Sequence, residues 1–545
     1  MNGTKGAALI VVSIGFVSTV GAQETDITQT PNAANAGIKK SLSQQIGAGR
    51  GDIVTPNSSA FIIARDPFRA IARGRQLFQR KFTLSQGSGP RTGDGVGDIE
   101  TDLSHGAGLA DSCAACHGRP QGSAGFGGDV FTRPSSRDAP HLFGLGLQEM
   151  LADEITQELR GIQTQAISDA IGAGSSVVAP LNSKGIHYGF ITAHSNGAVD
   201  TSAVEGVDSD LRVRPFFAEG TTISMREFIV GAFNAEMGLE SPDPDLLTAS
   251  GGGMVVTPGG MVLDGSTDSI EGTPASGIFD DPDLDGVVNE IPQSLVDFVE
   301  FYLLNYFKPG VRLAEDTHPF VIDDPIAGGD PFNSNPSQSR GRRTFEQIGC
   351  TECHIPDLTI DVDRRVADVE TVLNEADGNP YNNLLATATP LLSGVDDMSG
   401  HPTLKVPLGN SFDVEDFFAD MKRHDLGPNF WEKNFDGTLQ KEFITEPLWG
   451  VGSTAPYGHD GRSPTLVDVI LRHGGEAQEA SNRFRSLNRR KRADVVEFLQ
   501  TLIIFSPPST ASNLNGIDPM APDYPVNGHG SIALSVLFNE PLDKE

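Results

Sequence analysis

The sequence has little positive charge. Lysine and arginine together number 40, against 72 aspartate and glutamate residues in 545, which gives a formal net charge of −32. Nucleic acids and anionic membrane surfaces bind proteins through positive surface, so neither is expected as a partner. A basic redox protein is compatible with the acidic surface, although solvation alone is the simpler explanation of the charge.

Long apolar runs are also scarce, and the only candidate for a targeting segment is at the N-terminus. Lys5 precedes an uncharged stretch over residues 7–20, and Ala22 ends a run of small residues suited to a signal peptidase. This pattern predicts a signal peptide over residues 1–22, with an uncleaved membrane anchor as the alternative. Of the later stretches, the most apolar, SLVDFVEFYLLNYF, contains acidic residues and predicts a buried helix. We therefore expect a periplasmic or secreted mature chain without membrane insertion.

Cysteine is rare, and all four cysteines occur in two pairs that are each followed at once by a histidine. The two motifs are Cys113-Ala114-Ala115-Cys116-His117 and Cys350-Thr351-Glu352-Cys353-His354. Disulfides, a redox dithiol or a zinc site would use the cysteines, but none of them requires those histidines. Attachment of c-type haem does require them, because two thiols bond to the porphyrin and the imidazole binds the iron. The motifs therefore predict two covalently bound haems c, with His117 and His354 as proximal ligands.

The flanks of both motifs have helical periodicity. SRGRRTFEQIG predicts a helix that Gly349 ends just before the second motif, and residues 492–505 predict a closing helix that packs back on it. IARGRQLFQRKF is a similar leader before the first motif. Because the motifs lie far apart, we expect each to anchor its own domain. The prediction is a mainly α fold with two cytochrome c-like helical haem domains, long loops and a small irregular or β excursion at 249–269.

These patterns set four predicted segments. They are a signal peptide at 1–22, an N-terminal haem domain with insertions at 23–330, a C-terminal haem domain at 331–510 and a tail at 511–545.

An acidic segment, DDPDLDGVVNE at 280–290, suggests a second kind of metal site. Its Asp-x-Asp-x-Asp-Gly pattern can gather carboxylates around Ca²⁺. Glu290 falls two positions early for an EF-hand loop, so an acidic turn is the alternative.

EPLWGVGSTAPYGHDGRSPTLVDVILRHGGEA (446–477) resembles the signature of the di-haem c-type oxidoreductases that are labelled thiol oxidoreductase-like or peroxidase. Matching stretches follow in order and flank both haem motifs: RDAPHLFGLGLQEML, VRPFFAEGTTISMREFIVGAFNAEMG, FEQIGCTECHIPDL and FADMKRHDLG. Together they cover most of residues 60–505. A more distant resemblance extends to bacterial cytochrome c peroxidases and to MauG-type enzymes, which oxidise a protein substrate. The thiol label has no support here, because every cysteine is assigned to haem.

The resemblance implies a peroxidase-like enzyme with a division of labour between its haems. The N-terminal haem would meet hydrogen peroxide or another small oxidant, and the C-terminal haem would pass electrons to or from a redox protein donor or a protein substrate. Two alternatives are a non-enzymatic di-haem electron-transfer cytochrome and a haem-dependent dioxygenase of the rubber-cleaving type. The three differ in whether the first iron is open, and in whether it reacts with peroxide or holds dioxygen.

The sixth ligand of the second haem departs from the family pattern. The resemblance places a methionine in APYMHDG, but this chain has APYGHDG with Gly458 at that position. We therefore predict His459 as the ligand, presented by a turn before a helix capped by Ser463. Tyr457 and His424 are alternatives, and a hydrogen bond from His459 to a haem propionate is the simpler role.

At the first haem, a peroxidase needs a group that moves a proton between the peroxide oxygens. Glu149 in GLGLQEML is the predicted catalytic residue. Gln148, Asp153 and Glu154 are alternatives, and a solvated start of a helix is an equally good explanation of these carboxylates.

Two further predictions concern side chains without ligand spacing. Trp449 is an electron-relay candidate near the second haem, with core packing as the more common role of a buried tryptophan. His473 is expected to lie beside a helix C-cap before Gly474. The remaining histidines are expected to be surface or structural residues: His105, His141, His187, His194, His318, His401 and His529.

Overall fold

The computed structural model describes residues 41–89, 110–118, 124–125, 129–130, 137–306, 311–312, 322–323, 336–373, 384–434 and 437–503. Helices make up 36% of the structure and strands 17%, the strands being spread over many small sheets. The mainly α prediction is therefore wrong, and the fold is mixed. The predicted signal peptide and C-terminal tail lie outside the described residues, and the domain boundaries stay predictions.

The helices of the described residues fall into an early and a late group. The early α-helices are α1 (Leu42–Ile46), α2 (Ser59–Arg65), α3 (Pro67–Phe78), α4 (Cys113–His117), α5 (Leu145–Ala173), α6 (Met225–Met237), α7 (Pro244–Ser250) and α8 (Gln293–Asn305). The late ones are α9 (Pro336–Gln347), α10 (Leu466–Arg472), α11 (Gln478–Ser486) and α12 (Arg489–Leu499). Short 3₁₀ turns are η1 (Leu84–Gln86), η2 (Cys350–Glu352) and η4 (Gly475–Ala477).

The strands pair antiparallel, mostly as two-stranded ribbons. The pairs are β1 (Asp129–Val130) with β2 (Arg137–Asp138), β6 (Met254–Val256) with β7 (Val262–Asp264), β8 (Val311–Arg312) with β9 (Ile322–Asp323), β10 (Leu358–Ile360) with β15 (Phe412–Val414), β11 (Ala367–Leu373) with β12 (Leu384–Pro390), β13 (Leu392–Val395) with β14 (Leu404–Pro407), β16 (Arg423–Asp425) with β19 (Glu442–Ile444), and β17 (Glu432–Lys433) with β18 (Leu439–Gln440). One sheet has the order β3 (Val177–Ser183), β4 (Ile186–Ala193), β5 (Val199–Val204). The β6–β7 ribbon confirms the predicted excursion at 249–269.

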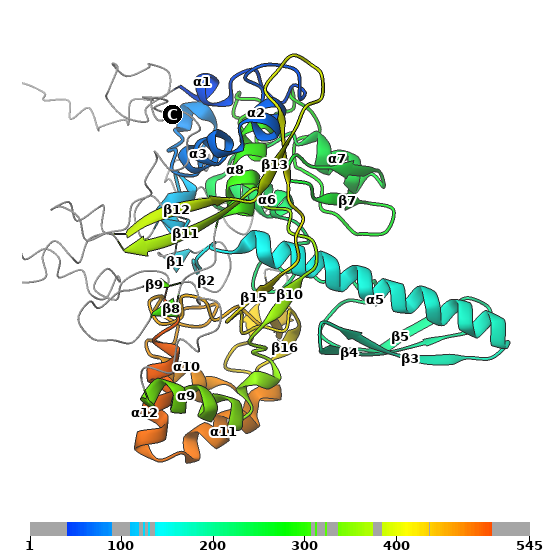
Figure 1. The fold of residues 1–545 in the computed structure, drawn as a ribbon, viewed down its shortest axis with the longest axis vertical. Coiled ribbons are helices and arrows are strands. Elements are labelled where there is room, and N and C mark those ends of the chain that lie inside the picture. The colour runs from blue at the N-terminus through cyan, green and yellow to red at the C-terminus, as the bar shows by residue number, and fades with distance from the viewer. Residues whose placement is uncertain are drawn as a thin grey trace, which may run out of the picture.

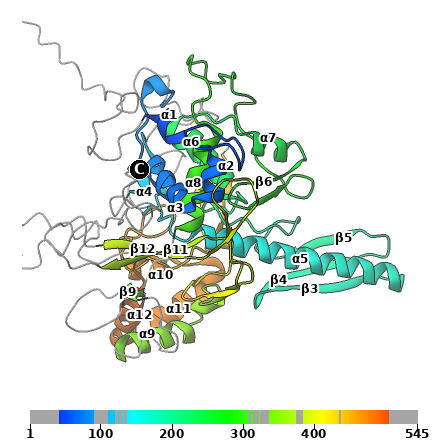
Figure 2. The ribbon, with the colours of Figure 1, turned by 45° about the horizontal axis from the view of Figure 1, so that its top comes forward.

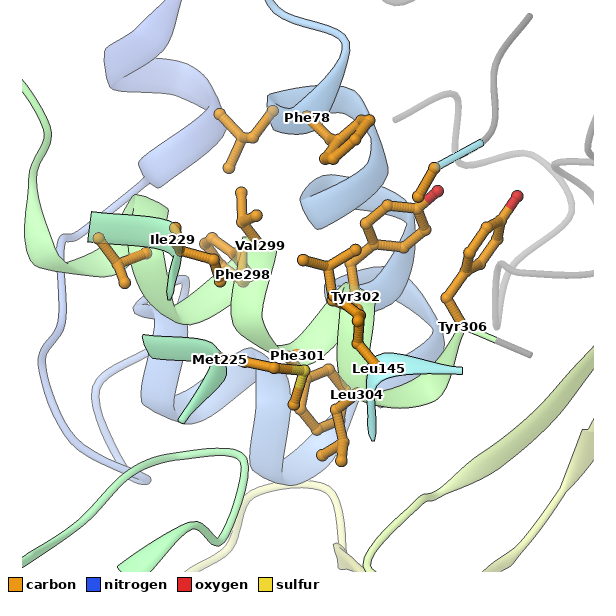
Figure 3. Close-up of a cluster of buried hydrophobic side chains, with 14 of the residues drawn as sticks. Phe78, Leu145, Met225, Ile229, Phe298, Val299, Phe301, Tyr302, Leu304 and Tyr306 are labelled. Atoms are coloured by element: carbon orange, nitrogen blue, oxygen red, sulfur yellow. The ribbon is translucent and has the colours of Figure 1, made fainter. Parts of the chain in front are cut away.

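One end of the molecule is a helical body built on α8, which is buried along its whole length (Figures 1 and 3). Its aromatic side chains Phe298, Phe301 and Tyr302 pack among aliphatic neighbours, and Phe78 of α3 joins them (Figure 3). Gly74 lets α3 approach α8 closely, because a Cβ there would lie 2.0 Å from the carbonyl oxygen of Phe298. The apolar segment SLVDFVEFYLLNYF is thus the buried helix that its composition predicts.

The long helix α5 projects from the body together with the β3–β4–β5 sheet, which lies along it in both views (Figures 1 and 2). Tight turns at Gly185 and Gly197, both with positive φ, connect the three strands. One face of β3 and β4 is buried against α5 and the other is exposed. This sheet is the largest departure from the predicted helical fold, since polar and small residues interrupt the apolar alternation of its outer strands, VVAPLNS and VDTSAV.

The opposite end of the molecule carries α9, α10, α11 and α12 (Figure 1). The α9 and α12 pair confirms the predicted leader and closing helices, although α12 ends at Leu499 rather than at 505. Phe345 and Phe498 pack edge to face, with ring centroids 5.6 Å apart. Arg340 donates two hydrogen bonds to Asp494 across the same pair. None of the helices in the described ranges is long and apolar enough to cross a membrane.

Candidate functional site

A cavity of about 860 Å³ lies between the two bodies, and both Cys-x-x-Cys-His motifs line it. Its walls come from α3, α6 and α8 on one side and from the 446–473 segment on the other. The volume is at the upper end of the range for small-molecule and cofactor sites. The two motifs, far apart in the sequence, therefore open on a shared space.

The first motif forms the one-turn helix α4. Two backbone hydrogen bonds attach the residues just before α4 to the helical body. The N–H of Ala110 donates to the Glu236 carbonyl, and the N–H of Phe82 donates to the Asp111 carbonyl. Nδ1 of His117 lies 2.7 Å from the Pro140 carbonyl oxygen, so it is the protonated nitrogen. Burial lowers the pKa of His117 to about 4, which keeps the imidazole neutral. A neutral ring held through Nδ1–H is the form in which histidine binds a metal.

The second motif has the same arrangement on different elements. Gly349, with φ of 92°, ends the α9 turn and leads into η2, and the N–H of His354 donates to the Cys350 carbonyl. Nδ1 of His354 lies 2.9 Å from the Phe418 carbonyl oxygen, and burial lowers the pKa of this histidine to about 4. No hydrogen bond to its Nε2 occurs within the described residues. Both proximal-ligand candidates are thus neutral imidazoles fixed by a backbone carbonyl.

The four thiols do not pair with one another. All four cysteines are free, and burial raises the pKa of Cys113 to about 12, that of Cys350 to about 12 and that of Cys116 to about 11. In the described part of the chain the four thiols do not gather into a single metal-binding group, which argues against a four-cysteine zinc site. Disulfides within the motifs are absent as well, so the thiols remain available for thioether bonds.

The cavity also fits a large amphipathic cofactor such as haem. The Nε1–H of Trp449 and the side-chain amide nitrogen of Asn234 are buried in its wall and lack hydrogen-bond partners among the described residues. Buried donors of this kind are costly unless a bound group satisfies them, and a carboxylate or a ligand oxygen would do so. Aromatic and aliphatic side chains supply most of the remaining lining: Phe78, Phe216, Phe228, Val299, Leu303 and Phe443.

His459, the predicted sixth ligand, lines the cavity. Its ring stacks on Phe443 with centroids 3.9 Å apart and planes 15° from parallel. Its Nε2 lies 3.9 Å from a carboxylate oxygen of Glu432. The expected cap was wrong in one detail, because Thr465, rather than Ser463, caps the following helix α10. Ligation by His459 stays a prediction.

His424, one of the alternatives, has both ring nitrogens engaged. Nε2 lies 2.8 Å from Asp420 and Nδ1 lies 2.7 Å from Glu476. Burial alone would lower its pKa, but Asp420 and Cys353 outweigh burial and raise the pKa to about 11. Cys353, Asp420 and His424 also form a group that could hold a metal ion, with ligand atoms within 4.8 Å. In this arrangement His424 is a charged hydrogen-bond donor with no nitrogen left for an axial bond.

Glu149 lies outside the residues that line the cavity. Its carboxylate accepts from Arg364 at 2.7 Å and from the Met225 N–H at 2.7 Å. Burial raises the pKa of Glu149 to about 8, against the opposing effect of Arg364. The side chain of Gln148, one position earlier, does line the cavity. The catalytic role of Glu149 stays a prediction, and the structure gives that carboxylate the contacts of a buried ion pair.

The other two alternatives also form ion pairs on α5. Asp153 accepts from Arg212 and Arg364, and Glu154 accepts from Lys184.

Two cavity histidines were not predicted as functional. His141 donates from Nε2 to the Trp449 carbonyl at 2.6 Å, and its buried Nδ1 has no partner in the part of the chain described. His473 ends α10 as expected, but it also faces the cavity. Sequence spacing does not indicate that either histidine lies at the cavity, because tertiary packing brings their elements there.

Asp281, Asp283 and Asp285 do gather, with carboxylate oxygens within 4.8 Å of one another. Their oxygens also accept backbone N–H groups of the same turn. Glu290 is directed elsewhere and accepts from the Glu240 N–H. Both a calcium loop and an acidic turn are compatible with this geometry, so calcium stays a prediction.

Among curated proteins, none is significantly similar to this chain. One solved structure with partial similarity is "Kuenenia stuttgartiensis Hydrazine Synthase Pressurized with 20 bar Xenon", with 18% identity and a TM-score of 0.21 over 38% of this chain. The similarity spans 55% of that chain, and a TM-score this low does not establish a shared fold. Residues 386–502 match the family described as "Di-haem oxidoreductase, putative peroxidase". This match confirms the resemblance that the sequence motifs indicated, because the segment that follows the second Cys-x-x-Cys-His motif is similar to that family.

Proposed function

We propose that this protein is a periplasmic or secreted di-haem c-type oxidoreductase of the peroxidase-like kind. The observation that carries the proposal is the shared cavity, into which both Cys-x-x-Cys-His motifs open with imidazoles fixed by backbone carbonyls. The family match over 386–502 supports the same chemistry. Hydrogen peroxide or another small oxidant is the proposed substrate, and a redox protein donor or protein substrate is the proposed partner.

Each motif would hold one haem through two thioether bonds and its histidine. Haem bound there would supply iron able to react with peroxide and to exchange electrons with a partner. The protein's own contribution is to fix the imidazoles: the Pro140 and Phe418 carbonyls hold Nδ1–H and leave Nε2 as the ligating atom. The apolar walls of the cavity would limit the access of water to the reacting centre.

The side of the cavity next to the first motif offers amides as well as the imidazole of His141, whose Nε2 is held by the Trp449 carbonyl. Asn234 lies on α6, whose Glu236 carbonyl accepts from the Ala110 N–H just before the motif. Asn234 and Gln148 both line the cavity, and an amide can donate a hydrogen bond to a small oxidant without competing for iron. This lining favours the first haem as the oxidant site, as the family resemblance implies.

The test begins with haem content and then with reactivity. A pyridine haemochrome assay and mass spectrometry of the purified protein should show two thioether-linked haems per chain; none, with zinc in their place, would contradict the proposal. Optical and EPR spectra should then change on addition of peroxide, and one haem should bind carbon monoxide. Two haems inert to both ligands would identify an electron-transfer cytochrome, and dioxygen bound in the resting protein would identify an oxygenase.

The compartment needs a separate measurement. Residues 1–22 lie outside the described residues, so export is argued from their composition and from the haem attachment motifs alone. N-terminal sequencing of the mature protein from a periplasmic fraction should begin at residue 23.

A further inference from the structure

His473 has the same hydrogen-bond arrangement as the proximal histidines. Its Nδ1 lies 2.7 Å from the Val469 carbonyl oxygen, which makes Nδ1 the protonated nitrogen. In the described part of the chain, its Nε2 has no hydrogen-bond partner. Burial lowers the pKa of His473, so the ring is neutral and Nε2 carries a lone pair. This is the state in which imidazole binds iron.

His473 is also close to His354. Both residues line the cavity, and Cys350 of the second motif belongs to the same apolar cluster as Ile470 and Leu471 of α10, the helix that His473 ends. A charge on His473 contributes to the lowered pKa of His354, as expected for neighbouring rings. Phe430 packs edge to face against the His473 ring at 5.4 Å. Two neutral imidazoles, each with a free Nε2, thus meet in one cavity.

The backbone around His473 is tied down, which would hold the ring in place. His473 is the C-cap residue of α10, and its N–H donates to the Val469 carbonyl. The N–H of Gly474 donates to the Leu426 carbonyl at 3.0 Å. Gly475 follows with φ of +48°, where a Cβ would lie 2.0 Å from the Asp425 carbonyl oxygen. This close backbone contact fixes the end of the helix.

The other candidates for this position are less suited to an axial bond. Both ring nitrogens of His424 are hydrogen-bonded to carboxylates, Nε2 to Asp420 and Nδ1 to Glu476. The ring of His459 stacks flat on Phe443, and its Nε2 faces Glu432. Burial raises the pKa of Tyr457 to about 12, which disfavours the phenolate that would bind iron.

We propose that His473 is the second axial ligand of the haem attached at Cys350 and Cys353. The proposal rests on the proposed function, because it requires a haem at the second motif. It gives that haem bis-imidazole ligation by His354 and His473, in a chain whose APYGHDG segment has no methionine to offer. Bis-imidazole ligation implies a lower reduction potential than histidine–methionine ligation.

The experiment compares His473→Gly with His459→Gly in the fully loaded protein. We expect the native protein to show a low-spin bis-imidazole EPR signal. In His473→Gly that signal should become high-spin and should return when free imidazole is added, while the first haem's spectrum stays unchanged. His459→Gly should keep the low-spin signal, and so should His187→Gly, a control at an exposed position of strand β4.

A conservative variant separates ligation from a purely structural role. His473→Met should remain low-spin but gain the methionine–iron charge-transfer band in the near infrared and a higher potential, which a side chain that only packs would not produce. Retention of the native spectrum and potential in both His473 variants would overturn the ligand assignment, as would loss of the low-spin signal in His459→Gly alone. Absence of haem from the native protein would instead contradict the proposed function.

Discussion

The two haem motifs have the same sequence pattern and the same histidine geometry, yet they face different surroundings. Around the first motif, the cavity wall includes aromatic and aliphatic side chains, the amide of Asn234 and the imidazole of His141, whose Nε2 is held by the Trp449 carbonyl. Near the second motif lie the imidazoles of His424 and His473, both of which affect the pKa of His354. On the proposed function, each motif would attach its haem in the same way, whereas the surrounding side chains would decide whether a second strong ligand is present.

If the two haems divide their roles as proposed, the difference would come from these surroundings, because the two motifs themselves are alike. A haem that faces amides and apolar groups keeps one coordination position for a small molecule, and a haem that faces an imidazole does not. The two bodies also differ in what holds them together. The helical body around α8 contains a buried ion-pair network beside its apolar core, whereas the α9–α12 body has an aromatic cluster at its centre.

The largest effect should come from removing a thiol. Cys113→Ala or Cys350→Ala removes one of the two thioether bonds of its haem, so that haem should be lost or only weakly held. A pyridine haemochrome assay should fall from two c-type haems per chain toward one in either variant. Optical spectra should then isolate the remaining haem, high-spin and peroxide-reactive in Cys350→Ala and low-spin in Cys113→Ala. The reverse assignment of the two spectra would contradict the comparison.

The second effect tests the buried charge of the helical body. The guanidinium of Arg226 is completely buried and contacts Asp243, Asp297 and Glu300 at 2.6–3.0 Å. Arg226→Met leaves those carboxylates buried with less compensation, which should lower the free energy of unfolding by about 3–5 kcal/mol. Urea denaturation measures this change. The control is Arg462→Met, whose side chain is 60% exposed and should shift stability by less than about 0.5 kcal/mol.

Features encoded within short stretches of sequence were predictable. The haem motifs, the buried helix α8, the α9 leader and the β6–β7 excursion follow from residues that are neighbours in the chain. The β3–β4–β5 sheet was missed because polar and small residues break the apolar alternation of its outer strands, VVAPLNS and VDTSAV, and one face is exposed. Strands without a clear alternation, inside a sequence rich in turns, are the features that local patterns specify least.

Long-range contacts explain the remaining differences at the site. Glu149 was predicted to be catalytic because the sequence around it does not reveal its ion-pair partner. That partner, Arg364, lies more than 200 residues further along the chain. His473 looked like a helix-end residue because nothing nearby in the sequence shows that α10 ends at the cavity. Carboxylates and imidazoles occur both in solvated turns and in functional sites, so only tertiary packing distinguishes the two roles.

A smaller effect concerns the charge of His424, and it depends on pH. In the chain without haem, Asp420 and the Cys353 thiol raise the folded-state pKa of His424 to about 11, above the ordinary value of 6.5. The imidazolium pair with Asp420 therefore stabilises the fold fully below about pH 6.5. That stabilisation is lost as pH rises through about 11. His424→Gln should therefore lower stability by about 2 kcal/mol at pH 6. The gap between variant and native protein in thermal or urea unfolding should narrow toward pH 10, and a constant gap would show that His424 is neutral.

The smallest effect separates the two neighbouring residues Gln148 and Glu149 at the first haem. Gln148 faces the cavity, so Gln148→Leu should remove one hydrogen bond to the bound oxidant and slow the reaction with peroxide about 10-fold, or ~1.4 kcal/mol. Glu149→Gln should chiefly weaken the contact with Arg364, lowering stability by about 1–3 kcal/mol with little change in rate. Stopped-flow mixing with peroxide and urea unfolding measure the two quantities independently.

The opposite result would restore the role predicted from sequence. If Glu149 moves the proton between the peroxide oxygens, Glu149→Gln should slow the reaction by about 10²–10⁴-fold while stability changes little. Such an outcome would require the Glu149 carboxylate to leave Arg364 and the Met225 N–H when haem is bound, since both hold it away from the cavity in this structure. Arg364→Met would then distinguish the cases, because releasing a catalytic carboxylate should alter the peroxide rate, whereas breaking a structural pair should alter only the free energy of unfolding.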